Sequence, residues 1–439
     1  MLEHLDLILT EKLNSKNATI GVVGLGYVGL PLAVEKAKAG FNVIGFDVQE
    51  EKVKNVNDGI NYIGDVLPAD LESLVSDGKL KATSDYSFIK EVDAVAICVP
   101  TPLDIYKQPN MAYVESSAKA IAANFTKGTL IVLESTTYPG TTEELIKPIL
   151  EESGMVCGED FFLAYSPERV DPGNKDFNTK NTPKVVGGIT EKCTKVAAAM
   201  YRAVLDGDVH EVSSPAVAEM EKLLENTFRN INVALANEMA ILCHKMGIDV
   251  WEVIDAAATK PYGFMPFYPG PGLGGHCIPI DPWYLTWKAR EYNYHTKLIE
   301  TAGEINDSMS EFVVQRCSEI LNTQGKSMKG SKIVVMGIAY KKDIDDYRES
   351  PVLPILDGLT KSGVEWEAID PFISEFKLNN KVIETIDLTE EKMQNADLVL
   401  IATNHTKFDY EMILNSASLV LDTRNSYANK KSLPKLIKL

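Results

Sequence analysis

Residues 19–47 read TIGVVGLGYVGLPLAVEKAKAGFNVIGFD, and this stretch decides the fold of the N-terminal part of the chain. Residues 19–23 are a short apolar run of the kind that forms a buried strand, and a helical pattern follows until Gly40. A second apolar run over 43–46 stops at Asp47. The order strand, glycine-rich turn, helix and strand predicts a βαβ unit with a parallel sheet.

The turn between the first strand and the helix carries the pattern G-x-G-x-x-G. Gly24 permits the tight turn, Gly26 lets a pyrophosphate approach the backbone, and Gly29 brings the helix close to the strand. Asp47 follows the second strand, where an acid accepts hydrogen bonds from a ribose diol. Because Asp47 would repel a 2′-phosphate and residues 48–51 supply no arginine, the pattern predicts NAD rather than NADP. The alternative is a tight turn that binds no ligand.

Further strands of the first domain are predicted over 93–99, 129–133, 161–164 and 185–188. Thr101 and Glu134 follow the first two of them, and Glu168 lies in the turn-rich loop after the third. In an open α/β sheet, ligands bind at the carboxyl ends of the strands, so these three residues are site candidates by position. The alternatives are that Thr101 caps a turn and that both glutamates are solvated.

Apolar residues recur at three- and four-residue steps from 216 to 245, which predicts a helix of about thirty residues. Such a helix is long enough to join two domains, and we expect a homodimer to form through it. Lys222 and Asn226 lie one turn apart on one of its faces. From the spacing alone, a solvated lysine and an asparagine with no special task are the favoured interpretation.

A loop rich in glycine and proline, YPGPGLGGHCIPIDP over residues 268–282, follows a shorter predicted helix at 249–259. Proline has no backbone N–H to donate, and glycine loses more conformational entropy than other residues when it is ordered. The loop is therefore expected to be neither helix nor strand. It places Cys277 beside glycines that let a ligand approach, with Asp281 four residues later as a base or orienting group. The alternatives are a nucleophilic cysteine and an ordinary connector between domains.

Composition limits the class of function. A formal net charge of −18 argues against a general nucleic-acid or anionic-membrane binder, so an anionic ligand must meet local basic residues. No run of about eighteen apolar residues occurs, and no membrane span is expected. The six cysteines form no C-x-x-C pair, which predicts reduced thiols, a cytoplasmic location and no metal site.

The C-terminal part repeats the strand, helix, strand order without the glycine fingerprint. Its predicted strands cover 332–336, 364–369, 397–402 and 419–422. Residues 337–343 after the first strand read GIAYKKD, where lysines such as Lys341 can hold phosphates; a solvated basic turn is the alternative. The sequence therefore predicts domains at 1–212, 213–322 and 323–439, with the cysteine loop in the middle one.

Several short motifs are shared with one family. They are GLGYVGLP at 24–31, VPTP at 99–102, EST at 134–136, SPE at 166–168, EKLLEN at 221–226, GLGGHC at 272–277, YKKD at 340–343 and RES at 348–350. In these motifs and their order the chain resembles the nucleotide-sugar 6-dehydrogenases, the UDP-glucose and GDP-mannose dehydrogenase family, over essentially its full length. The resemblance implies two Rossmann-like doubly wound domains joined by a central helical domain, with NAD bound by the first and the UDP-sugar by the last.

The resemblance also implies the reaction, a four-electron oxidation of the sugar's 6-hydroxyl to a carboxylate with two NAD. Cys277 would trap the intermediate aldehyde as a thiohemiacetal and then hold a thioester that water cleaves. The loop at 268–282 is most similar to the branch that oxidises UDP-N-acetylglucosamine. UDP-N-acetylmannosamine, UDP-N-acetylgalactosamine and UDP-glucose are the alternative substrates, and the acid would serve surface polysaccharide synthesis.

Site residues follow from the same resemblance. The residues that it implies for catalysis are Cys277, Lys222, Asn226, Asp281, Glu134, Glu168 and Thr101. The residues that it implies for NAD binding are Gly24, Gly26, Tyr27, Val28, Gly29, Asp47, Thr101, Thr136 and Arg348. The residues that it implies for substrate binding are Glu168, Lys222, Asn226, Lys260, Gly274, Lys341 and Arg424. Lys222 and Asn226 would stabilise the alkoxide and oxyanion, and the two glutamates would bring water to the thioester. His276 receives no role.

Three other classes compete with this interpretation. A two-electron β-hydroxyacid dehydrogenase needs neither a reactive cysteine nor a second α/β domain. A cysteine hydrolase would leave the dinucleotide fingerprint without a use. A non-catalytic dinucleotide or nucleotide-sugar sensor would tolerate serine at position 277, whereas the dehydrogenase should not.

Overall fold

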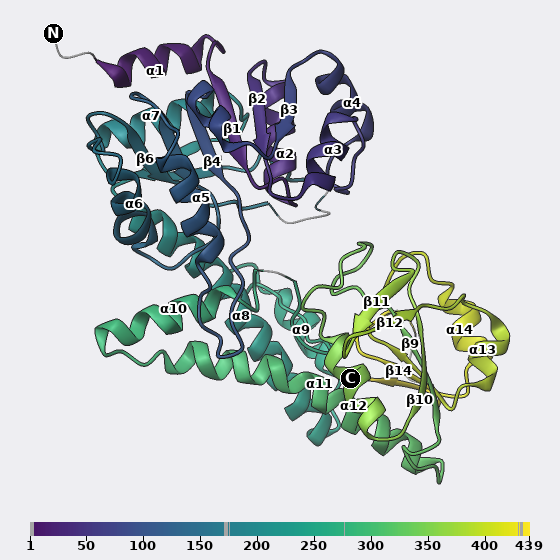
Figure 1. Ribbon diagram of the computed structural model, residues 1–439. Coiled ribbons are helices and arrows are strands. Elements are labelled where there is room, and N and C mark those ends of the chain that lie inside the picture. Colours follow the sequence, from purple (N-terminus) through teal and green to yellow (C-terminus); the bar gives the residue numbers. More distant parts are fainter. Residues whose placement is uncertain (1–3, 171–173, 175, 276, 429, 431–432) are drawn as a thin grey trace. The chain divides into compact units, whose positions relative to one another are not determined.

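The computed structural model describes residues 4–170, 174, 176–275, 277–428, 430 and 433–439, and the chain divides into two units (Figure 1). Unit 1 comprises residues 1–225 and 283–293, and unit 2 comprises residues 226–282 and 294–439. His276, to which the sequence assigned no role, lies outside the described residues.

Unit 1 is built on an eight-stranded sheet with the order β3-β2-β1-β4-β5-β6-β7-β8. The strands are β1 Thr19–Val23, β2 Asn42–Phe46, β3 Leu80–Thr83, β4 Ala94–Ile97, β5 Leu130–Leu133, β6 Phe162–Tyr165, β7 Lys184–Gly188 and β8 Val209–Val212. Neighbouring strands are parallel except β6 and β7, which run antiparallel. The middle strands β4 to β6 are buried along their whole length, as expected where helices cover both faces of a parallel sheet.

Helices connect these strands. They are α1 Leu5–Asn14, α2 Gly29–Lys38, α3 Glu50–Asn57, α4 Pro68–Ser76, α5 Ala112–Ala122, α6 Lys147–Glu151 and α7 Glu191–Arg202. α7 packs along β5 to β8, and α1 packs on α7. α7 therefore covers the strands that end near the predicted glutamates.

The long helix predicted over 216–245 is α8, Pro215–Met246, and the boundary between the two units falls within it. The other helices of the middle part of the chain are α9 Val250–Ala258, α10 Asp281–Ala289 and α11 Lys297–Thr323. In unit 2, Ala240 and Cys243 of α8 share a buried apolar cluster with Trp251 and Ile254 of α9. α10 begins at Asp281, so the last two residues of the loop at 268–282 are helical, contrary to the expectation for the whole loop. Proline is tolerated there because the first turn of a helix needs no backbone N–H donor at that position.

A second parallel sheet forms the C-terminal part of unit 2, with the order β10-β9-β13-β14-β15. Its strands are β9 Lys332–Met336, β10 Glu365–Ile369, β13 Leu398–Ile401, β14 Val420–Asp422 and β15 Leu436–Lys438, and a separate antiparallel hairpin joins β11 Glu375–Leu378 to β12 Lys381–Glu384. The helices are α12 Val352–Lys361, α13 Glu390–Asn395 and α14 Tyr410–Ser416. Val335 and Leu400 of the sheet pack with Leu356 of α12 in the core.

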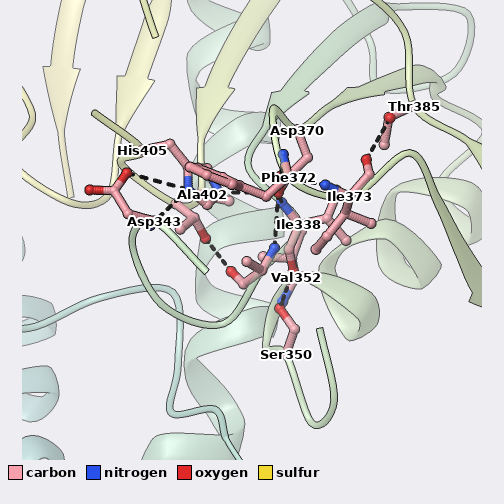
Figure 2. A network of polar contacts seen from close by, with 12 residues as sticks. Ile338, Asp343, Ser350, Val352, Asp370, Phe372, Ile373, Thr385, Ala402 and His405 are labelled. Carbon is pink, nitrogen blue, oxygen red and sulfur yellow. Dashed lines mark hydrogen bonds and ion pairs between the residues drawn. The ribbon is translucent and has the colours of Figure 1, made fainter. Parts of the chain in front are cut away.

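The two parallel sheets use the same first turn. Gly337 follows β9 with a φ of +86°, as Gly24 follows β1 with a φ of +91°. Asp370 follows β10, and its carboxylate accepts hydrogen bonds from the backbone N–H of Ile338 at 2.7 Å and of Phe372 at 2.9 Å (Figure 2).

Only the first of these turns keeps the complete glycine pattern. Ala339 stands two residues after Gly337, where the first unit has Gly26. The buried His405 also approaches Asp370, with 3.1 Å between Nε2 and the carboxylate, and its Nδ1 accepts from the Asp343 N–H at 3.0 Å (Figure 2). The Asp370 carboxylate is thus occupied by contacts within its own domain.

Each strand predicted from the sequence is present to within one or two residues, and the predicted α/β fold class is confirmed. The strands that the sequence did not predict are β3, β8, β11, β12 and β15. β3, β8 and β15 lie at the edges of their sheets, and β11 and β12 form the separate hairpin. These three edge strands are only three or four residues long and are not buried along their whole length, so they lack the apolar run that marks a central strand.

Candidate active site

The glycine turn of unit 1 is shaped for a close ligand. A Cβ on Gly24 would lie 2.5 Å from the carbonyl oxygen of Cys98, and a Cβ on Gly29 would lie 1.7 Å from that of Gly24. A Cβ on Gly26 would meet no atom within 4 Å, so the backbone is open there to a pyrophosphate. Val28 precedes the first residue of α2, and Tyr27 is exposed beside it. The turn therefore fits a dinucleotide at the N-terminus of α2.

Asp47 lies at the end of β2 and faces this turn. Its Oδ2 accepts the N–H of Leu25 at 2.8 Å and its Oδ1 accepts the N–H of Gln49 at 2.9 Å. Each carboxylate oxygen keeps a second lone pair, so both can also accept from a ribose diol. The Lys52 ammonium lies 3.6 Å from Oδ2. The residues present thus fit NAD at this edge of the sheet.

Thr101 and Thr136 follow the neighbouring strands β4 and β5. The buried Thr101 accepts a hydrogen bond from the Tyr284 hydroxyl at its carbonyl. The Ser135 hydroxyl donates to the carbonyl of Val99 at 2.8 Å and accepts from the same residue's N–H at 3.0 Å. These bonds tie the ends of β4 and β5 together, and Thr136 is half-buried directly after them.

Glu134 and Glu168 share one cation. The Lys184 ammonium lies 2.9 Å from Glu134 Oε2 and 3.2 Å from Glu168 Oε2. Glu134 Oε1 also accepts from the Tyr201 hydroxyl at 2.6 Å. Burial by itself would raise the pKa of Glu168, but Lys184, the N–H of Val170 and Lys222 outweigh it and lower that pKa. Burial likewise acts to lower the pKa of Lys184, and the two glutamates raise it instead.

The first turns of α8 are anchored to unit 1 by carboxylates. The buried Glu219 accepts from the backbone N–H of Gly140 at 2.6 Å and of Thr142 at 2.9 Å. Arg169, next to Glu168 in the chain, forms an ion pair with Glu225 of α8 and donates to the carbonyl of Pro183 at 2.9 Å. Lys222 lies on the same stretch of α8 and is buried. Glu168, Arg169 and Lys222 are thus part of one charged cluster.

The cysteine loop of unit 2 is closed by a turn that starts at Cys277. The Cys277 carbonyl accepts from the N–H of Ile280 at 3.0 Å and of Asp281 at 2.8 Å. The Asn226 amide donates to Asp281 Oδ2 at 2.5 Å. Cys277 is half-buried, whereas the other five cysteines are buried. The structure therefore brings three predicted residues together, Asn226, Asp281 and Cys277.

Buried asparagines hold this loop at further points. Asn237 of α8 accepts from the Gly270 N–H at 3.0 Å, and Asn230 donates to the Ile278 carbonyl at 3.3 Å. Asn306 of α11 joins them, because it accepts from the Asn237 amide at 2.9 Å and donates to the Asn230 carbonyl at 3.1 Å. The loop has little regular secondary structure, and side-chain amides supply the hydrogen bonds that a helix or sheet would provide.

The glycines of the loop pack against the segment that follows β9. A Cβ on Gly274 would lie 2.6 Å from the Cβ of Tyr340 and 3.0 Å from the backbone carbonyl oxygen of Glu349. A Cβ on Gly275 would lie 2.9 Å from the Tyr340 ring. A Cβ on Gly272 would lie 2.8 Å from Pro351, and the Ser310 hydroxyl donates to the carbonyl of Pro351 at 3.1 Å. The motifs at 272–277, 340–343 and 348–350 are therefore in contact within unit 2.

Arg424 and Lys341 are the basic residues of this region. Arg424 follows β14, and its guanidinium packs against Gly270 of the cysteine loop. A Cβ on Gly270 would lie only 2.6 Å from Arg424 Nη1. Its Nε donates to the Ala402 carbonyl at 2.9 Å, and burial lowers its pKa to about 10. A partly desolvated guanidinium of this kind is stabilised by a bound anion. Lys341 is half-buried in the segment next to the cysteine loop.

Two predicted ligand-binding residues are exposed in unit 2. Arg348 forms an ion pair with Asp346, with 2.7 Å between Nη2 and Oδ2. The Lys260 ammonium lies 5.1 Å above the ring of the exposed Tyr262.

Several polar residues of these clusters were not predicted from the sequence. They are Ser135, Lys184, Tyr201, Glu219, Asn230, Asn237 and Asn306. The available signal was a polar side chain at a position that an apolar pattern makes buried, such as Lys184 before Val185-Val186 or Asn237 within α8. That signal does not identify the hydrogen-bonding partner of the buried residue. Here the partners belong to other helices, strands or loops.

The residues that the structure describes contain neither a cluster of metal ligands nor a membrane-spanning helix. No group of three or more histidine, cysteine, aspartate or glutamate side chains is placed to hold a metal ion there. Among the helices that the structure describes, none combines the length and apolar character needed to cross a bilayer.

Most of the chain matches the domains of one protein family. Residues 18–205, 216–308 and 334–429 match the NAD-binding, central and UDP-binding domains of the UDP-glucose/GDP-mannose dehydrogenase family. A UDP-N-acetyl-D-glucosamine 6-dehydrogenase of Pseudomonas aeruginosa is 38% identical over 360 residues, which cover 82% of this chain and 84% of that protein. An NDP-N-acetyl-D-galactosaminuronic acid dehydrogenase of Ralstonia solanacearum is 34% identical over 425 residues, 94% of this chain and 97% of that protein. The solved structure of a UDP-D-ManNAc dehydrogenase from Pyrococcus horikoshii superposes with a TM-score of 0.87 at 35% identity and covers 96% of this chain and 98% of its own.

Proposed function

Since the chain belongs to the UDP-glucose/GDP-mannose dehydrogenase family and its N-terminal domain is the family's NAD-binding domain, we propose that it oxidises the 6-hydroxyl of a UDP-N-acetylhexosamine to a carboxylate. UDP-N-acetylglucosamine is the proposed sugar. The relatives named above act on acetamido sugars, which supports that class, and they differ in the epimer. The observation that carries the proposal is the half-buried Cys277 in a loop held by Asn226, Asn230 and Asn237.

The proposed chemistry uses the groups described above. NAD, when bound at the glycine turn, would supply the hydride acceptor for both oxidations. The Cys277 thiolate attacks the aldehyde carbon, and the resulting thiohemiacetal becomes a thioester after the second oxidation. The Lys222 ammonium and the Asn226 amide stabilise negative charge on the sugar oxygen. Asp281 orients the Asn226 amide through the 2.5 Å hydrogen bond.

The nucleotide end of the substrate is proposed to bind unit 2. The Arg424 guanidinium and Lys341 supply positive charge that attracts a diphosphate, whose binding the overall net charge of −18 otherwise disfavours. Arg348, Lys260 and Gly274 remain proposed ligand contacts, as do Thr101, Thr136, Tyr27 and Val28 in unit 1. The domain bounds 1–212, 213–322 and 323–439 are part of the same proposal.

The first test of the function is the yield of NADH per sugar under excess NAD. UDP-N-acetylglucosamine, its manno and galacto epimers and UDP-glucose are each supplied to the purified protein. We expect two NADH per molecule of one acetamido sugar, because the aldehyde is not released. One NADH would show an alcohol dehydrogenase that stops at the aldehyde, and none on all four sugars would reject the proposal in favour of a sensor.

A homodimer through α8 is proposed from its surface. The exposed apolar residues of this helix recur on one side, and they are Val217, Met220, Leu224, Phe228, Leu235, Leu242 and Met246. Leu224 and Leu235 are 64% and 56% exposed. A continuous apolar stripe of this length is typical of a covered interface.

Leu235→Glu is therefore expected to turn a dimer into a monomer, since it places a charge in the apolar stripe. Sedimentation velocity at micromolar concentration measures this change. Arg229→Glu, an exposed position of α8 outside the stripe, is the matched control and should leave the dimer intact. A monomeric wild-type protein would contradict the proposal.

A further inference from the structure

The two glutamates predicted to activate water differ in their surroundings. Both oxygens of Glu134 are used inside the protein, by the Tyr201 hydroxyl and by Lys184, and the residue is 1% exposed. Both oxygens of Glu168 are also bonded, since Oε1 accepts the backbone N–H of Arg169 at 2.8 Å and of Val170 at 2.9 Å and Oε2 accepts from the Lys184 ammonium at 3.2 Å. The Glu168 side chain nevertheless keeps 17% of its surface exposed. Of the two glutamates, Glu168 is therefore the one that a ligand can reach.

Lys184 connects the two. It is the first residue of β7, and β7 runs antiparallel to β6. An antiparallel strand begins at the edge where its parallel neighbours end, so Lys184 reaches the same edge as the residues that follow β5 and β6. Glu168, Lys184 and Tyr201 also line one small cavity together with Leu32 and Thr182.

We infer that Lys184 is a positioning residue that holds Glu168 ionised and oriented as the base for thioester hydrolysis, and that Glu134 acts through Lys184 rather than on the water. In this step the water oxygen attacks the thioester carbon, one water proton passes to Glu168, the C–S bond breaks, and the sulfur leaves as the Cys277 thiolate. The inference rests on the proposed function.

Charge explains why a cation is needed there. Without Lys184, two carboxylates would lie in a buried cluster, and both burial and mutual repulsion favour the protonated acid. The other charged or titratable groups that act on the cluster come from four elements and the loop after β6. They are Lys36 of α2, Cys98 after β4, Tyr201 of α7, Arg169 of the loop, and Lys222, Glu221 and Glu225 of α8. Lys36 is buried over the Tyr201 ring at 5.0 Å, and burial lowers its pKa. Lys184 is the cation in contact with both carboxylates.

Lys184→Met should move the acidic limb of the pH profile for acid formation to higher pH by about one to three units, because Glu168 loses the cation that keeps it ionised. KM for the sugar should change little and kcat at neutral pH should fall. Lys184→Arg keeps the charge and should keep the limb near its wild-type position. An acidic limb that stays in place in a folded Lys184→Met protein overturns the inference.

Glu134→Gln provides a test of opposite sign that keeps the shape of the side chain. Without the Glu134 charge, Glu168 is the one carboxylate that Lys184 contacts, and the repulsion from Glu134 is gone. The pKa of Glu168 should therefore fall, and the acidic limb should move to lower pH while acid is still formed. Complete loss of acid formation in a folded Glu134→Gln protein would show that Glu134 is itself the base. Thermal melts and NADH binding show whether the Lys184→Met protein folds. If it does not, Glu134→Gln decides which glutamate is the base.

The wild-type protein separates the two possible failures. If it yields two NADH per sugar and the variants show unshifted limbs, the role of Lys184 is wrong and the function stands. If it yields no NADH on any of the four sugars, the proposed function itself fails.

Discussion

Cys277→Ser should fold and bind NAD like the wild-type protein but form no acid. In the proposed mechanism the thiol attacks the aldehyde, and a serine hydroxyl is far less ionised than a thiol near neutral pH. We expect the rate of acid formation to fall by at least about a thousand-fold, as for removal of other catalytic nucleophiles. The substitution is nearly isosteric, so the turn formed by the N–H groups of Ile280 and Asp281 on the residue 277 carbonyl is preserved.

The measurement for this variant is product identity under excess NAD. The first oxidation needs no thiol, so the serine variant should give at most one NADH per sugar and an aldehyde that hydroxylamine traps. Cys277→Ala should behave in the same way, since neither side chain forms a thioester. Cys317→Ser, at a buried position of α11 within the C-terminal core cluster, serves as the control for loss of a thiol elsewhere. Normal acid output from Cys277→Ser would refute the covalent scheme.

Gly26→Ala and Gly29→Ala should fail in different ways although they lie three residues apart. A Cβ at position 29 would lie 1.7 Å from the Gly24 carbonyl oxygen, so the turn and α2 have to move. We expect Gly29→Ala to lose about 3 kcal/mol or more of stability, which is typical of severe overpacking. A Cβ at position 26 meets no protein atom within 4 Å, so Gly26→Ala should melt close to the wild-type temperature.

The loss in Gly26→Ala should appear in ligand binding instead. The added methyl group occupies the space through which a pyrophosphate approaches the backbone, and we expect the affinity for NAD to fall about a hundred-fold. Calorimetric titration with NAD and a thermal melt of each variant separate the two effects. Unchanged NAD affinity in Gly26→Ala would show that the dinucleotide does not use this turn.

The first turn of the second parallel sheet shows which parts of the glycine pattern are structural. Its first turn repeats the glycine with positive φ and the aspartate that accepts backbone N–H groups, at Gly337 and Asp370. It carries Ala339 in place of the glycine that admits a pyrophosphate. The shared part of the turn is therefore structural, and the part that differs is where we propose that the first sheet binds NAD.

Features that depend on local pattern could be predicted from the amino-acid sequence alone. The strand and turn of residues 19–47, the long helix α8 and the glycine-rich loop around Cys277 follow from residues that are neighbours along the chain, because backbone conformation and periodic burial are local properties. For the same reason the family motifs were readable, and the fold class and the NAD-binding domain that they imply were confirmed by the comparisons.

Only the tertiary structure decided which buried polar groups act on the predicted residues. Lys184 reaches Glu134 and Glu168 because β7 turns back antiparallel to β6, and no pattern in the chain marks that reversal. Asn237 and Asn306, which are 69 residues apart in the sequence, form a hydrogen bond that helps to hold the cysteine loop. Such contacts join elements distant in sequence, and their geometry depends on how whole elements pack, which a pattern of neighbouring residues does not contain.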